Sequence, residues 1–341
     1  MAGEAGAGGQ AAAVPIAMVG CGAIAHAYLQ ALQRVPTLRL VGVVDPAPAA
    51  AAAAGQQGGA PTFADLPSLF ASGLQPRAAL VLAPPDQHEP LCCELLARGL
   101  HVLCEKPLAP TLAAAQRMLA AAHHADRRLM MGSKFRYTQD VLAARRLLDS
   151  GFCGTVVMYE NVFCAPVDMT RRWNADPARS GGGVLIDNGC HSVDLARYLL
   201  GPLARVQAQF GPRAQAVPVE DTARLLFTST AGALGSIDLS WSVHKETPAY
   251  VRIHGTQGTL EIGWQKSRHK ALGAADWTVF GQGYDKVAAF AAQLANFAGV
   301  VQGREPPGID DADALASVVV VATAYQAQRE ERWLPIPTVG P

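Results

Sequence analysis

The chain has 341 residues, half of them hydrophobic, and its 28 basic and 28 acidic side chains balance. This length and composition are typical of a globular protein with room for two domains, and they exclude a disordered chain. Because no Lys/Arg cluster exceeds a pair, nucleic acid and anionic membrane surfaces are not expected as partners. No apolar run reaches the length of a membrane span.

Cysteine usage and the N-terminus bear on localisation. Seven cysteines occur without any C-x-x-C spacing, which suits buried thiols in a reducing, cytoplasmic setting. The start MAGEAGAGGQAAA lacks a basic region and a leucine-rich core, so residues 1–13 are predicted to be a flexible tail and not a signal peptide. We therefore expect a cytoplasmic protein.

The next segment has the pattern of a dinucleotide-binding fold. An apolar strand at 16–19 leads into GCGAIA and a helix, and a second buried strand ends at Asp45, 25 residues after Gly20. Gly20 permits the tight turn, Gly22 lets the backbone approach a pyrophosphate, and the helix offers free N–H groups to that anion. Asp45 can accept hydrogen bonds from both ribose hydroxyls, and the following PAPAA lacks an arginine for a 2′-phosphate. The sequence therefore predicts NAD(H) over NADP(H).

The α/β alternation continues, which predicts a dinucleotide-binding Rossmann domain over 14–133. Strands are expected in AALVLAPP, HVLCE and LMMGSKFRY, and helices in CCELLARG and TLAAAQRMLAAAHHADRR. Ligands bind beyond the carboxyl ends of parallel strands. For His88 the alternative is a hydrogen bond at the start of a helix. The predicted cofactor contacts are Gly20, Gly22, Ala23, Ile24, Asp45, Pro85, His88, Glu105 and Lys106.

After Gly154 the sequence changes to successive strand-like segments separated by glycine turns. Strands without intervening helices predict a large, mostly antiparallel sheet in an α+β substrate and oligomerisation domain over 134–337. Helices are expected at 187–200, 285–302 and 312–329, too few to cover both faces of the sheet. We therefore expect a homodimer or homotetramer that covers an apolar open face. That face is expected to include Leu225, Phe227, Ile237 and Leu239.

The stretch GGGVLIDNGCHSVDLARYLLG places Asp187, His191, Asp194 and Tyr198 on one stripe of a mostly apolar helix. Such a line is either a satisfied structural network or part of an active site. The thiol of Cys190 is a further candidate nucleophile, although no known nucleophile turn surrounds it.

These segments together resemble the Gfo/Idh/MocA oxidoreductase family. The resemblance rests on GCGAIA, VVD, APPDQHEPL, HVLCEKP, GSKFRY and GGGVLIDNGCHSVDL, which occur in this order over nearly the whole chain. It implies an N-terminal Rossmann fold, a C-terminal domain with a large, predominantly antiparallel sheet, and a nicotinamide site where Lys106, Asp187 and His191 meet. The histidine indicates a site of the inositol-dehydrogenase type, because the glucose–fructose oxidoreductase branch has tyrosine there.

With this resemblance, the predicted activity is NAD(H)-dependent hydride transfer to or from a secondary hydroxyl or ketone of a sugar, nucleotide-sugar or cyclitol. We expect His191 to accept the hydroxyl proton, Asp187 to orient its ring, and Lys106 to stabilise charge on the substrate oxygen. Asp194 and Tyr198 are expected to be structural, and no metal is expected.

Substrate contacts and the reaction type leave alternatives open. A second possibility is an NAD-dependent enzyme that uses a transient 3-keto sugar for elimination or glycoside cleavage. A third is a non-catalytic NAD-binding regulator, although a regulator has no reason to retain the catalytic triad. The predicted substrate contacts are Lys106, Arg136, Asn161, Arg172, Trp173, Asp187 and His191.

Overall fold

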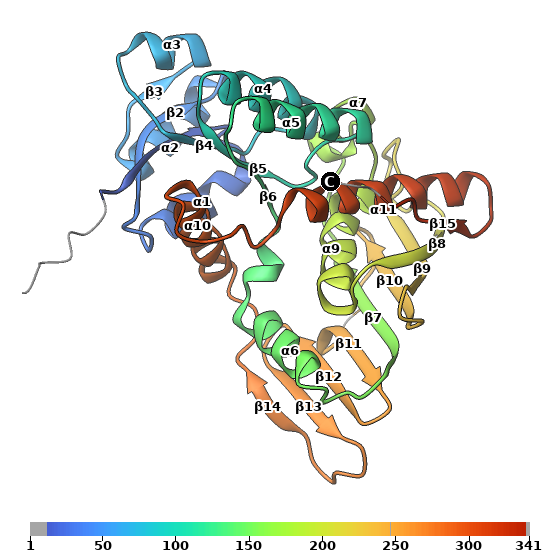
Figure 1. Cartoon of the computed structure of the whole chain (residues 1–341). Coiled ribbons are helices and arrows are strands. Elements are labelled where there is room, and N and C mark those ends of the chain that lie inside the picture. Colours follow the sequence, from blue (N-terminus) through green and yellow to red (C-terminus); the bar gives the residue numbers. More distant parts are fainter. Residues whose placement is uncertain (1–11, 246, 339–341) are drawn as a thin grey trace, which may run out of the picture.

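The computed structural model describes residues 12–245 and 247–338. Two sheets run through it, and helices pack against both (Figure 1). Most of the predicted N-terminal tail lies outside the described residues, so that prediction stays untested. None of the helices in the described ranges is both long and apolar enough to cross a membrane.

The first sheet has six parallel strands in the order β3-β2-β1-β4-β5-β6. Apolar strands fit here because helices cover both faces of such a sheet. The strand order runs outward from β1 to β3 on one side and from β4 to β6 on the other. Ligands bind at the carboxyl ends of the strands where the order changes side, which is between β1 and β4. The strands are β1 Val14–Val19, β2 Leu38–Val44, β3 Thr62–Phe63, β4 Ala78–Val81, β5 His101–Glu105 and β6 Leu129–Gly132. The helices are α1 Ala23–Leu32, α2 Pro48–Gly58, α3 Leu66–Ala71, α4 His88–Ala97 and α5 Leu112–His124. The predicted Rossmann architecture is confirmed.

The strand predicted over LMMGSKFRY is shorter than expected. β6 ends at Gly132, and Lys134–Tyr137 form a 3-10 turn, η2. Thr138 then caps α6, Gln139–Asp149, by accepting a hydrogen bond from the Val141 N–H. The 3-10 turn points consecutive side chains in three directions, whereas an extended strand alternates them between two faces.

The second sheet has nine strands in the order β14-β13-β12-β11-β7-β10-β9-β8-β15. Neighbours are antiparallel except β7 and β10, so the predicted mostly antiparallel sheet is confirmed. The GTQG segment forms the predicted hairpin turn between β11 and β12. The strands are β7 Val156–Cys164, β8 Leu203–Phe210, β9 Thr222–Ser229, β10 Leu234–Ser240, β11 Ala249–Gly255, β12 Gly258–Gly263, β13 Ser267–Ala271, β14 Thr278–Gly281 and β15 Leu334–Pro335.

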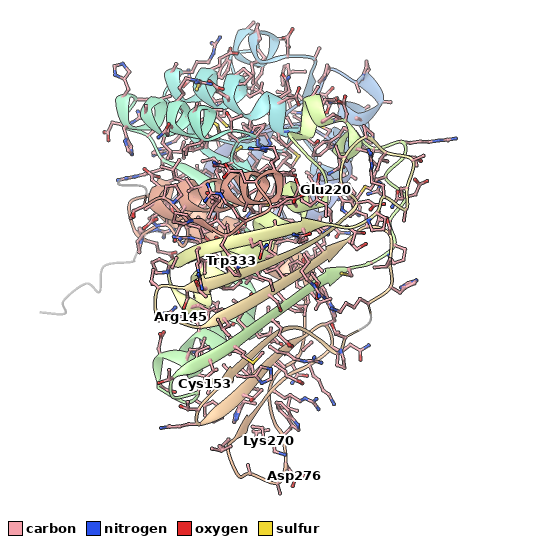
Figure 2. The ribbon with its side chains drawn as sticks, turned by 90° about the vertical axis from the view of Figure 1, so that its right-hand side faces the viewer. Arg145, Cys153, Glu220, Lys270, Asp276 and Trp333 are labelled. Atoms are coloured by element: carbon pink, nitrogen blue, oxygen red, sulfur yellow. The ribbon has the colours of Figure 1, made fainter. Side chains whose placement is uncertain are left out.

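Helices cover one face of this second sheet. These are α6, α8 (Val184–Asp187), α9 (Gly189–Leu200) and α11 (Asp311–Arg329). Figure 2 shows the other face, where no helix lies in front of the strands. The expected composition of that face was wrong: Leu225, Phe227, Ile237 and Leu239 are at most 2% exposed and face the helices. Consecutive strand residues point to opposite faces of the sheet. A prediction that is shifted by one residue therefore exchanges the residues of the open face for those of the helix-covered face.

The helix α10, Lys286–Val301, returns from the second domain to the first. Its residues Phe290, Leu294 and Phe297 are fully buried in one core with Ile16 of β1. Phe290 lies 4.3 Å, centroid to centroid, from the ring of Tyr28 on α1. The last part of the chain therefore completes the hydrophobic core of the Rossmann domain (Figure 1).

Candidate active site

The glycine turn after β1 is shaped for a close backbone approach. Gly20 has φ +96°, and a Cβ there would lie 2.7 Å from backbone atoms of Leu82 and Ala83. Gly22 is the N-cap of α1 without a side-chain hydrogen bond, and a Cβ on it would meet nothing within 4 Å. The first N–H groups of α1 therefore face open space, which fits the pyrophosphate of a dinucleotide.

Asp45 is fixed at the end of β2. Its Oδ2 accepts a hydrogen bond from the Cys21 N–H at 2.7 Å, and its Oδ1 accepts one from the Ala47 N–H at 2.8 Å. Each carboxylate oxygen has a second lone pair for a ribose hydroxyl. Burial and this carboxylate raise the pKa of the Cys21 thiol to about 12, so that thiol stays protonated.

A cleft of about 310 Å³ begins at the glycine turn and runs between the two domains. It contains several of the predicted cofactor and catalytic residues together with the loop before α8. Its lining residues are Gly22, Ala23, Ile24, Leu82, Ala83, Glu105, Lys106, Lys134, Met169, Arg172, Trp173, Asn174, Asp187 and Lys286.

Lys106 and Asp187 form an ion pair inside this cleft. The Lys106 Nζ lies 2.7 Å from Asp187 Oδ1 and 3.0 Å from the Asp187 carbonyl oxygen. Burial is the largest influence and opposes the ammonium charge, but Asp187 together with Cys190 and Glu105 outweighs it and raises the pKa of Lys106 above its ordinary value. Lys106 is therefore a fixed cation at the carboxyl end of β5.

The run Gly181–Gly183 places Asp187 at this position. A Cβ on Gly183 would lie 2.0 Å from the Glu220 carbonyl oxygen, so only glycine lets the chain pass there. The N–H groups of Gly183 and Leu185 both donate to Glu220 Oε1 at 3.0 Å. The predicted helix over 187–200 corresponds to α9, and the short α8 precedes it, with helical backbone angles at Asn188 between them.

The partner predicted for Asp187 needs correction. Its carboxylate bonds Lys106 and makes no hydrogen bond with the imidazole of His191. The His191 Nε2 instead lies 3.3 Å from Lys134 Nζ, and the buried Nδ1 has no hydrogen-bond partner among the described residues. Burial, Lys134 and Lys106 all lower the pKa of His191 well below its usual value, so the ring is neutral.

Glu105 lies in the cleft wall and is held from two sides. Its Oε1 accepts a hydrogen bond from the Tyr28 hydroxyl at 2.7 Å, and its Oε2 accepts one from the Lys106 N–H at 3.1 Å. Gln293 of α10 in turn donates to the Tyr28 hydroxyl at 2.9 Å. This chain of hydrogen bonds connects the cleft to the helix that returns from the second domain.

His88 and Pro85 lie behind the cleft wall. The His88 ring is 1% exposed, with Nδ1 2.9 Å from the Pro107 carbonyl oxygen and Nε2 2.8 Å from that of Ala83. Burial lowers its pKa in spite of these carbonyls. Pro85 is also buried, at the start of a short 3-10 turn. His88 therefore holds together the two loops that follow β4 and β5.

Arg136, a predicted substrate contact, has a structural partner instead. Its guanidinium forms a two-pronged ion pair with Asp194, with contacts of 2.6 to 3.0 Å, and also reaches Asp313 at 2.6 Å. Its side chain is 5% exposed and that of Asp194 is fully buried. Asn161 is likewise 1% exposed and donates to the Tyr250 carbonyl oxygen at 2.9 Å. Neither residue lines the cleft, so both substrate assignments are withdrawn.

The loop before α8 supplies the other predicted substrate contacts. Arg172 and Trp173 line the cleft, and Trp173 is 36% exposed. Cys190 is buried, and burial raises the pKa of its thiol to about 12 against the opposing charge of Lys106. A thiolate nucleophile at Cys190 is therefore not supported.

Sequence reasoning missed one lysine of the cleft, Lys286, and did not predict what Lys134 contacts. Lys134 lies on η2 and Lys286 begins α10, and both line the cleft. Lys134 stands in GSKFRY, which carried the family resemblance, but a single lysine in a loop gives no sign of its partners. Together with Lys106 and Arg172, these side chains make the cleft rich in cations.

Comparisons with known proteins bear on the family and fold of the chain. The profile of the oxidoreductase family with an NAD-binding Rossmann fold matches residues 14–133, and the GFO/IDH/MocA C-terminal domain matches 141–261. An inositol 2-dehydrogenase of Rubrobacter xylanophilus is 26% identical over 98% of this chain and 96% of its own. A D-apiose dehydrogenase of Paraburkholderia graminis is 28% identical, over 72% of this chain and 66% of its own.

The fold is also that of solved oxidoreductases. The crystal structure of an oxidoreductase from Agrobacterium radiobacter in complex with NAD⁺, L-tartaric acid and magnesium superimposes with a TM-score of 0.86. The two proteins share 22% sequence identity, over 95% of this chain and 98% of that one. At this identity the likeness concerns the fold alone.

Cofactor preference can be tested at Asp45. Because its carboxylate repels a 2′-phosphate, NAD⁺ should bind at least about tenfold more tightly than NADP⁺, or by about 1.4 kcal/mol. Asp45→Ala should narrow this gap, and Asp45→Asn separates the loss of charge from the loss of size. Calorimetric titration measures the affinities of each variant for NAD⁺ and for NADP⁺. Equal affinities in the unmodified protein would contradict the assignment.

The Arg136–Asp194 pair predicts a large effect on stability. Arg136→Met leaves a fully buried carboxylate without its partner, and we expect a loss of about 3–5 kcal/mol in the free energy of unfolding. Arg117→Met, which removes an exposed pair with Glu89, should cost less than about 1 kcal/mol. Urea denaturation compares the two, and similar small losses would mean that the buried pair is not structural.

Proposed function

Because the chain belongs to the Gfo/Idh/MocA oxidoreductase family, we propose that it is an NAD(H)-dependent dehydrogenase of sugars, nucleotide-sugars or cyclitols. The substrate is oxidised at a secondary hydroxyl or reduced at the corresponding ketone. One observation carries the proposal: the Lys106–Asp187 pair lies in the same cleft as the glycine turn that fits a dinucleotide.

The residues of the cleft match the needs of alcohol oxidation. A bound nicotinamide supplies the hydride acceptor. Lys106 remains an ammonium group because of Asp187, so it can donate a hydrogen bond to the hydroxyl oxygen and stabilise negative charge as the proton leaves. Gly22 and the start of α1 hold the pyrophosphate, and Asp45 holds the adenosine ribose.

The substrate class is inferred from the lining of the cleft and from the relatives. The segment before α8 contributes Arg172, Trp173 and Asn174 to the lining of the cleft. These side chains offer hydrogen-bond donors and an aromatic surface, which suit a polyol. The relatives named inositol 2-dehydrogenase and D-apiose dehydrogenase support a cyclitol or a sugar.

The two alternative functions can be distinguished by the products that are released. An enzyme that works through a transient 3-keto sugar regenerates its cofactor and releases no net NADH. A non-catalytic regulator binds NAD⁺ and oxidises nothing. The presence of Lys106 and Asp187 as a partly buried pair in the cleft favours an enzyme over a regulator.

We also propose that two or four copies assemble through the open face of the second sheet. That face carries the exposed Met158, Leu226 and Leu234 among cross-strand ion pairs such as Arg224–Asp238. A cytoplasmic location belongs to the same proposal, and all seven cysteines are free thiols.

The function is tested by following NADH absorbance while NAD⁺ and single cyclitols, aldoses or nucleotide-sugars are supplied. We expect sustained NADH formation with at least one compound of these classes. A burst of at most one NADH per active site with continued consumption of the sugar would favour the 3-keto alternative. NAD⁺ binding without turnover of any compound would favour the regulator.

Lys106 should control chemistry more than cofactor binding. Lys106→Met removes the cation that stabilises the substrate oxygen, and kcat should fall about a hundredfold or more. NAD⁺ affinity should change only modestly, because the glycine turn and Asp45 remain. Asp187→Asn keeps an oxygen for the ammonium group and should cost less. Near-normal turnover of Lys106→Met would contradict this role.

Assembly is tested by light scattering. The protein should have two or four times the 35.7 kDa mass of one chain at micromolar concentration. Leu226→Asp places a charge on the proposed interface and should shift the mass toward the monomer. Leu272→Asp, at a site that is 79% exposed beside the β13–β14 turn, should leave the mass unchanged. A monomeric unmodified protein would contradict the proposal.

A further inference from the structure

Lys134 stands between the cleft and the histidine of the family motif. Its side chain lines the cleft, whereas His191 is 6% exposed and does not. The Lys134 Nζ lies 3.3 Å from His191 Nε2, and this is the only side-chain hydrogen bond of either group among the described residues. A substrate in the cleft therefore meets the lysine before the imidazole.

The other polar groups near Lys134 are already committed. Asp187 binds Lys106, which remains protonated, and Glu105 accepts hydrogen bonds from Tyr28 and from the Lys106 N–H. Taking the hydroxyl proton at either carboxylate would weaken these contacts.

Lys134 has no acidic partner within ion-pair distance in the described part of the chain. Its Nζ lies 5.1 Å from the ring centroid of Phe135 and 5.5 Å from that of Phe290. The charged groups that face it are Glu105 at the end of β5, Lys106 directly after it, Asp187 from α8 and Lys286 from α10. Burial, with Lys106 and Lys286, lowers the pKa of Lys134 to about 8, against the two carboxylates.

We propose that Lys134 takes the proton of the substrate hydroxyl during oxidation, and that His191 is a positioning residue behind it. This assignment rests on the dehydrogenase function proposed above. It replaces the expectation that the imidazole itself accepts the proton.

The proton and electron balance of this step is complete. The substrate C–H bond breaks with its electron pair, which reduces NAD⁺ to NADH, and the O–H bond breaks with its proton passing to the neutral Lys134 amine. The carbon–oxygen bond becomes a carbonyl, so the alcohol is oxidised to a ketone. The new ammonium group donates a hydrogen bond to His191 Nε2, whose own pKa is too low to hold the proton.

The pH dependence follows from the neutral form being the active one. Below pH 8 the neutral fraction of Lys134, and with it the oxidation rate, should rise about tenfold per pH unit, and above pH 8 the rate should level off. Ketone reduction needs the ammonium form, so its rate should be level below pH 8 and should fall about tenfold per pH unit above pH 8.

The test compares pH profiles of kcat/KM for alcohol oxidation. Lys134→Met should lose the step near pH 8 and about a hundredfold in rate, with recovery when methylamine is added. Lys134→Arg should stay slow at every pH, because guanidinium does not release its proton. Lys286→Met removes a cation that lowers the pKa of Lys134, so the step should remain but move to higher pH. His191→Ala should also keep a step. A step that survives in Lys134→Met and disappears in His191→Ala would overturn the proposal.

A second measurement needs no substrate. The chain has six lysines, so ¹³C-labelled lysine gives a spectrum in which Lys134 is the signal removed by Lys134→Arg. We expect this signal to titrate near pH 8 with NAD⁺ absent or bound, and titration near pH 10.5 would overturn the proposal. If no compound is oxidised in the absorbance screen while Lys134 titrates near pH 8, the dehydrogenase function fails and the ionisation of Lys134 stands.

Discussion

The ion pair between Lys106 and Asp187 is the contact on which the geometry of the cleft depends. It joins the carboxyl end of a Rossmann strand to the junction of α8 and α9, 81 residues later. Both side chains are less than a fifth exposed, so either one alone would leave a poorly solvated charge. The pair therefore fixes the distance between the two domains where a substrate must reach both.

Three further ties keep this pair in place, and each joins distant segments. Gln293 and Tyr28 connect the wall of the cleft to α10, and Arg136 connects η2 to α9 through Asp194. Glu220 receives the backbone N–H groups at the start of α8. A buried ion pair or hydrogen bond stabilises the fold only while both partners stay in place. These contacts therefore hold the elements around the cleft rigidly.

Local patterns predicted the parts of the protein that depend on nearby residues. The glycine turn, Asp45 at the end of β2 and the antiparallel hairpin at GTQG were read from spacing and turn chemistry alone. The gathering of Lys106 and Asp187 in one cleft was expected only from the family resemblance. No periodicity relates two residues so far apart in the chain.

The failures share a physical cause, which is long-range pairing. Arg136 was expected to contact a substrate. In the structure Asp194 and Asp313 bind its guanidinium, and nothing in the sequence indicates that these residues lie beside it. Asp187 was expected to orient His191 because one helical turn separates them, but its carboxylate binds Lys106 instead. The contact between Lys134 and His191 could not be predicted, because the two residues lie on different elements.

The most direct test of this account is a crystal structure of the protein with NAD⁺ and a substrate, or a slowly reacting analogue, in the same cleft. We expect the nicotinamide ring beside Lys106 and the reacting hydroxyl oxygen within hydrogen-bond distance of both Lys106 Nζ and Lys134 Nζ. The account would be contradicted if the hydroxyl contacted His191 directly with Lys134 turned away, or if the nicotinamide lay outside the cleft.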